Sequence, residues 1–95
     1  MISFLNNSSL KPYIKFKEKY DAASSLNRKN IEAISISSYS TESKEVNSRF
    51  VNLKLVDLRN SIFFSNYNSP KSQEFKDHSQ IAALLYWNTT NTQIR

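Results

Sequence analysis

Hydrophobic residues recur along the chain with two different periods, and each period predicts one type of secondary structure. From Lys11 to about Asn27, apolar side chains follow one another at spacings of three and four. These side chains are Tyr13, Phe16, Tyr20 and Ala23. Such spacing places them on one face of an amphipathic helix, and Pro12 suits its first turn. Residues 1–10, half of which are Ser or Asn, are predicted to form a loose N-terminus.

A period of two replaces this pattern farther along and predicts short strands. Ile34 and Ile36 alternate with Ala and Ser, as in a half-buried strand. The polar segment 41–45 is predicted to turn the chain into a strand at 46–57, and the segment 58–60 turns it again into a third strand at 61–66. Short strands joined by short polar turns indicate an antiparallel meander.

The remaining segments predict a short helix followed by two strands. Ser69 is a good N-cap and Pro70 then falls at the first helical position, so a helix is expected to run to about His78. Residues 80–87 are apolar enough for a central strand. Residues 88–91 turn the chain into another strand, and no repeat or linker divides residues 11–95, which are therefore predicted to be a single domain.

Composition excludes several functional classes. The 95 residues contain no Cys, no Gly and one His, which removes thiol chemistry, His-cluster metal sites and the glycine loops that cradle nucleotide phosphates. Because Gly is absent, turn positions that require a positive φ are expected to be occupied by Asn. A net charge of +5 is compatible with nucleic acid, an anionic membrane or a phosphorylated small molecule. No signal peptide or apolar spanning segment is recognisable, so a cytoplasmic location is expected.

Two features carry candidate chemistry. The helix start at Ser69, Pro70 and Lys71 offers unpaired backbone N–H groups and a cation, which predicts a phosphate site; the alternative is an exposed lysine on a surface helix. In the second feature, Arg49 and Lys54 lie five residues apart in one predicted strand, so they should point to opposite faces of the sheet.

Four segments, taken in order, resemble the pyridoxamine 5′-phosphate oxidase family: SRFVNLK, IFFSNYNSPKSQEF, IAALLYW and TQIR. The resemblance runs from about Ile31 to Arg95. It implies an FMN-binding split β-barrel, antiparallel and Greek-key-like, in a homodimer that binds flavin mononucleotide (FMN) between its subunits. Family members continue beyond the matched segments, so the barrel is expected to be truncated at its C-terminus.

The resemblance also implies which residues meet the cofactor. The strand motif comprises Arg49, Phe50, Val51, Asn52, Leu53 and Lys54. Arg49 would lie at the phosphate end, and Lys54 near the isoalloxazine ring and the substrate, as the residue implied in catalysis and in substrate binding. One extended ligand would meet both cations if a β-bulge resets the strand alternation, or if the strand end twists across the dimer interface.

The remaining implied site residues come from three other segments. Phe64 and Ser65 would line the flavin, and a Gln that contacts the flavin ring in the family is matched by Gln93. At the helix start Ser69 and Lys71 match the family pattern. Pro70 stands in place of an Arg that normally helps to hold the phosphate, and it is counted with the cofactor-binding segment. No metal is implied.

The implied reaction is the FMN-dependent oxidation of pyridoxamine or pyridoxine 5′-phosphate to pyridoxal 5′-phosphate, with dioxygen as the acceptor, in vitamin B6 metabolism and pyridoxine biosynthesis. The expected partners are a phosphorylated B6 vitamer and a second copy of the chain, not nucleic acid or a membrane. The alternative is a truncated flavin-binding protein, or a small basic interaction module, without oxidase activity.

Overall fold

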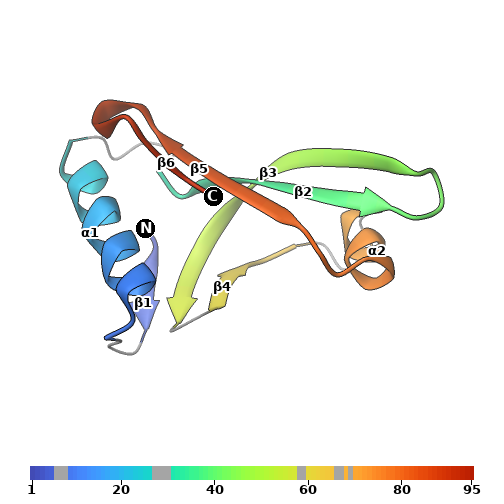
Figure 1. Cartoon of the computed structure of the whole chain (residues 1–95), viewed down its shortest axis with the longest axis horizontal. Helices are drawn as coiled ribbons and strands as arrows, with labels where there is room; N and C mark the ends of the chain where they lie inside the picture. Colours follow the sequence, from blue (N-terminus) through green and yellow to red (C-terminus); the bar gives the residue numbers. More distant parts are fainter. Residues whose placement is uncertain (6–8, 27–30, 58–59, 66–67, 69) are drawn as a thin grey trace.

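The computed structural model describes residues 1–5, 9–26, 31–57, 60–65, 68 and 70–95, which form one six-stranded sheet with two α-helices (Figure 1). The elements are β1 (Ser3–Leu5), α1 (Lys11–Leu26), β2 (Ala33–Ser40), β3 (Glu45–Asp57), β4 (Asn60–Phe63), α2 (Pro70–Asp77), β5 (Ala82–Trp87), the 3-10 helix η1 (Asn88–Thr90) and β6 (Thr92–Ile94). The two α-helices lie at opposite ends of the sheet. The prediction of a mainly β fold with two helices is confirmed.

The strand order follows a Greek key rather than a simple meander. Strands β2, β3 and β4 pair antiparallel in sequence, but β5 returns to pair with β2 instead of β4. This gives the spatial order β5-β2-β3-β4, in which the fourth strand of the set lies beside the first. The central position predicted for β5 is confirmed, because β5 lies between β2 and β6.

The expectation of a loose N-terminus is wrong for residues 2–5. Strand β1 pairs in parallel with residues 55–57 of β3, so the sheet is also not wholly antiparallel. The side chain of Ile2 is buried, and its backbone N–H donates to the Tyr20 hydroxyl at 2.9 Å. The ring of Phe4 packs edge-on against Tyr13 and Phe16 of α1. The apolar Ile2 and Phe4 alternate with Ser3, which is the period of a strand.

Helix α1 covers the core through the face that its sequence predicted. Tyr13, Tyr20 and Ala23 are buried, and Phe16 is partly buried against the same cluster. The Trp87 ring of β5 lies 6.0 Å from the Tyr20 ring, centre to centre, and its indole Nε1 donates to the Ile31 carbonyl at 2.6 Å. These contacts fix one end of the sheet to α1.

The two faces of the sheet differ in their covering. One face carries Ile36, Leu53 and Leu85, all almost completely buried. On the other face Ser35 of β2 lies opposite both Phe50 of β3 and Leu84 of β5, so these three side chains form a row across three strands. Phe50 is 74% exposed and Leu84 38% exposed.

Two local expectations differ from the structure. Among the described residues, positive φ occurs at Lys44, with φ of 60°, as well as at Asn91, with φ of 48°, so Asn does not fill both such positions. Lys44 ends the turn between β2 and β3, where its exposed side chain meets no packing constraint. The third predicted strand also ends early, because β4 stops at Phe63 and leaves Phe64 and Ser65 beyond it.

Candidate functional site

Strand β3 contains a β-bulge at the position of Lys54. The pairing with β4 shifts register between Leu53 and Leu55, so Lys54 is the extra residue. Leu53 and Val56 are both buried although they lie three residues apart, which shows that the alternation is reset between them. A bulge is therefore present at Lys54, and that one ligand meets both Lys54 and Arg49 because of it stays a prediction. Lys54 itself is exposed, whereas Arg49 is half-buried.

Arg49 lies on the covered face of the sheet, against α2. It is directly opposite Ile36 in the register of β2 and β3. Its Nη1 donates to the Ser38 hydroxyl at 2.7 Å and to the Ile36 carbonyl at 3.3 Å. Its Nη2 lies 3.7 Å from Oε1 of Glu74 in α2. Arg49 therefore connects the predicted flavin strand with the helix whose first turn is the predicted phosphate site.

Glu74 is one of the residues that hold α2 against the sheet, together with Phe75, whose ring packs on that of Phe63 in β4. It is 7% exposed. Its Oε1 accepts a hydrogen bond from the Ser38 hydroxyl at 2.6 Å, and its Oε2 accepts one from Nδ2 of Asn47 at 3.3 Å. This cluster was not predicted from the sequence, because Glu74 lies among other charged residues of a helix that was predicted without its packing partners.

The hydrogen bond from Ser38 is the main reason why the pKa of the Glu74 carboxyl lies below its ordinary value. Asn47 and the Arg49 guanidinium lower this pKa further, whereas burial acts in the opposite direction. Glu74 is thus held as a carboxylate at neutral pH, and the cluster contains a cation and an anion side by side.

The lowered pKa of Glu74 predicts a loss of stability in acid. Because this pKa is depressed in the folded chain, its contribution is fully present above the unfolded-state glutamate pKa of about 4.3. The contribution is lost as the pH falls through the folded-state pKa. Glu74→Gln should therefore lose less free energy of unfolding than the wild type in urea titrations over about pH 3–6. Parallel pH profiles of the two proteins would contradict this assignment.

The other residues of the strand motif divide between the two faces of the sheet. Phe50 and Asn52 are exposed on the open face. Val51 is half-buried, and Leu53 is completely buried in the core, where its side chain packs against other apolar groups. A ligand on the open face would thus meet Phe50 and Asn52, whereas Arg49 faces α2.

The remaining predicted site residues lie in three places. Phe64 and Ser65 are exposed and follow β4 rather than forming part of it. Pro70 and the half-buried Lys71 are the first two residues of α2, whereas Ser69 lies outside the described residues. Gln93 of β6 lines a pocket together with α1. The structure thus brings Arg49 to α2, but it places Gln93 beside α1, at the other end of the sheet.

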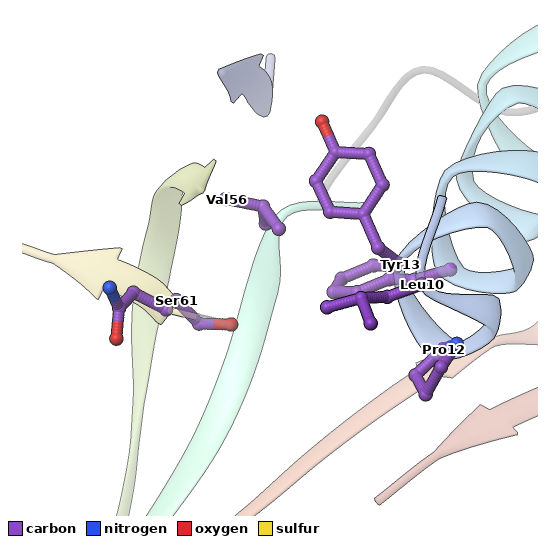
Figure 2. A pocket seen from close by; sticks show the side chains of 7 residues that line it. Leu10, Pro12, Tyr13, Val56 and Ser61 are labelled. Atoms are coloured by element: carbon purple, nitrogen blue, oxygen red, sulfur yellow. The ribbon is translucent and has the colours of Figure 1, made fainter. Parts of the chain in front are cut away.

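A separate pocket of about 460 Å³ opens between the start of α1, the end of β3 and the start of β4 (Figure 2). It is lined by Leu10, Pro12, Tyr13, Phe16, Val56, Asn60 and Ser61. Figure 2 shows Leu10, Pro12 and Tyr13 on the helix side, with Val56 and Ser61 on the strand side. None of the described residues predicted to bind the cofactor lines this pocket, so it is distinct from the candidate site.

The described part of the chain contains no group of three His, Asp or Glu side chains placed to hold a metal ion. Neither of its two α-helices is long and apolar enough to cross a membrane. The charged side chains predicted at the candidate site are Arg49, Lys54 and Lys71.

No protein-family model matches the chain. Comparison with curated proteins, however, finds relatives that are named pyridoxine/pyridoxamine 5′-phosphate oxidase. The chain is 41% identical over 64 residues to a pyridoxine/pyridoxamine 5′-phosphate oxidase of Colwellia psychrerythraea. It is 33% identical over 84 residues to the oxidase of that name from a Nostoc species. These matches cover 67% and 88% of the chain, but the chain spans only 29% and 39% of the two relatives.

A solved structure has the same fold over most of the chain. PhzG from Burkholderia lata, crystallised in complex with tetrahydrophenazine-1-carboxylic acid, superposes with a TM-score of 0.72 and 23% sequence identity. The match covers 84% of this chain and 40% of the PhzG chain.

Proposed function

The chain is a homologue of the pyridoxine/pyridoxamine 5′-phosphate oxidases, and we propose that it binds FMN and takes part in the oxidation of pyridoxamine or pyridoxine 5′-phosphate. We further propose that its sheet is part of an FMN-binding split β-barrel. The observation that carries the proposal is the contact of Arg49 with α2. This contact places Arg49 of β3 against Glu74 of α2, the helix whose first turn is the predicted phosphate site.

The residues at this junction fit a phosphate group. A guanidinium offers several N–H donors in a planar fork that matches phosphate oxygens. The first turn of α2 adds backbone N–H groups and the positive end of the helix dipole. Arg49, Lys71 and this first turn would hold the FMN phosphate.

The other end of the cofactor is assigned to Lys54 and the open face of β3. Bound FMN would supply the acceptor for a hydride equivalent from the substrate, with dioxygen as the final acceptor of the electrons. Lys54, exposed at the bulge, would place its ammonium group near the ring and orient the phosphorylated substrate. Phe64, Ser65 and Gln93 remain proposed contacts of the flavin, as does the exposed side chain of Asn52.

Two measurements on the purified chain test this function. The protein should show a flavin absorption spectrum, either as isolated or after incubation with FMN, and should release peroxide when pyridoxine 5′-phosphate is added. Flavin binding without peroxide release would support a flavin-binding protein without oxidase activity. A colourless protein that takes up no added FMN would contradict the proposal and favour the basic interaction module.

A homodimer with FMN at its interface is also proposed, and the open face of the sheet supports it. Phe50, Leu84 and Tyr86 expose 74%, 38% and 57% of their surfaces on this face. Neighbouring apolar side chains of this kind are typical of protein–protein contacts. Sedimentation equilibrium should show a dimer that Phe50→Lys weakens, because the variant places a charge in the contact. A wild-type chain that sediments as a monomer at all concentrations would refute the dimer.

The cytoplasmic location stays a prediction.

A further inference from the structure

The cation proposed to bind phosphate already has an anionic neighbour within the chain. Glu74 Oε1 lies 3.7 Å from Arg49 Nη2, and the two side chains are 9% and 24% exposed. Glu74 is four residues beyond Pro70, so it lies about one helical turn from the start of α2 on the same side of the helix. A phosphate bound by Arg49 and the first turn of α2 would therefore lie close to this carboxylate.

We propose that Glu74 is an internal competitor for phosphate at Arg49, one that balances the guanidinium charge in the chain without ligand and weakens phosphate binding. This inference rests on the proposed function, because it assumes that Arg49 meets the FMN phosphate. Glu74 acts through Arg49 and is not itself a ligand of the cofactor. Its role is to limit how tightly the site holds a phosphorylated ligand.

The hydrogen bonds of Glu74 hold its carboxylate in place without Arg49, which has hydrogen bonds of its own to Ser38 and Ile36. The short bond of the carboxylate is to Ser38, at 2.6 Å, and a second bond comes from Asn47. The separation of 3.7 Å from Arg49 is too long for a good hydrogen bond, so the attraction between these two groups is mainly one of charge. A turn of Arg49 towards a phosphate would break its own bonds to the Ser38 hydroxyl and the Ile36 carbonyl, whereas Glu74 would keep its bonds to Ser38 and Asn47.

The charges also determine whether removal of Glu74 should raise or lower the affinity for phosphate. A carboxylate and a phosphate that share one cation repel each other, and side chains that are mostly buried are screened less by salt than exposed ones. Glu74 is ionised at neutral pH, as an ordinary glutamate is, and Ser38, Asn47 and Arg49 lower its pKa further against the opposing effect of burial. Removal of its charge should therefore strengthen phosphate binding, whereas damage to the fold would weaken it.

The test is Glu74→Gln, which keeps the side-chain volume and one oxygen to accept the Ser38 hydrogen bond. We expect FMN to bind about two- to fivefold more tightly to this variant, as for the loss of a partly screened charge pair. Riboflavin, which has no phosphate, should bind as it does to the wild type. The matched control is Glu18→Gln, which makes the same change in net charge on an exposed position of α1 and should leave FMN affinity unchanged.

A double variant shows whether the effect of Glu74 on FMN affinity depends on Arg49. In the Arg49→Ala protein, addition of Glu74→Gln should bring no gain in FMN affinity. An equal gain in both backgrounds would mean that Glu74 acts on the ligand directly or on net charge, and the inference would be wrong. Unchanged or weaker FMN binding by a folded Glu74→Gln protein would also overturn it, yet would leave the proposed function intact if the wild type binds FMN.

A measurement on the wild type covers the case in which Glu74→Gln does not fold. FMN, but not riboflavin, should shift the NMR signal of the Glu74 carboxyl carbon as the guanidinium turns away from it. Absence of a shift at saturating FMN would refute the competition. If the wild type binds no FMN at all, the proposed function fails, and the inference about Glu74 fails with it.

Discussion

Replacement of Trp87 by alanine is expected to lower the free energy of unfolding by about 3–5 kcal/mol, the usual cost of removing a large buried aromatic side chain. Trp87 is 3% exposed and its ring lies against Phe16 and Tyr20 of α1. Its indole also donates to the Ile31 carbonyl, which would lose its partner. The loss is a large part of the roughly 5–15 kcal/mol that stabilise a typical domain.

Urea unfolding followed by circular dichroism measures this effect, with Leu26→Ala as the control. Leu26 is also a large apolar residue, but it is 68% exposed at the end of α1, and its replacement should change the free energy of unfolding by no more than about 0.5 kcal/mol. Equal stability of the two variants would show that α1 does not pack on β5 through Trp87.

Arg49→Ala and Lys71→Ala are each expected to weaken FMN binding about ten- to a hundredfold. Each substitution removes a charge-assisted contact with phosphate, which contributes roughly 1.5–3 kcal/mol. Arg49→Lys keeps the charge but loses the planar fork, so its affinity should lie between those of the wild type and Arg49→Ala. Flavin fluorescence quenching measures the three variants.

Riboflavin separates a role in phosphate binding from a role in folding. Arg49 also holds Ser38 and Glu74, so its removal affects the packing of α2 as well. If the loss of affinity arises at the phosphate, riboflavin binding should change little in either alanine variant. An equal loss for riboflavin and FMN would show that Arg49 and Lys71 act on the fold instead.

The elements that the sequence predicted well are those that bury one face, because burial of one face gives a regular spacing of apolar residues along the chain. The spacing of Tyr13, Tyr20 and Ala23 predicted α1, and the alternation of Ile34 and Ile36 predicted β2. The pairing of β1 with β3 was not predicted, because a three-residue strand carries too little periodicity and takes its stability from distant partners such as Tyr20.

At the candidate site, too, features within one element were predicted and features that depend on distant partners were not. The resemblance implied Arg49 and the start of α2 as phosphate contacts, which stay predictions, and a bulge in β3, present at Lys54, was one of two arrangements considered. The cluster of Ser38, Asn47 and Glu74 around Arg49 was missed, because it joins three elements and depends on how α2 packs against the sheet. Side chains that meet only through tertiary packing leave no periodic signal along the chain.

The central claim is that the chain recognises FMN through its phosphate at Arg49 and α2. Titration of the wild-type protein with FMN and with riboflavin, under the same buffer and salt, tests it most directly, because the two ligands differ only in the phosphate. The account predicts that FMN binds at least about ten times more tightly than riboflavin, the effect of one charge-assisted phosphate contact. Equal affinities for the two flavins, or no binding of either, would contradict it.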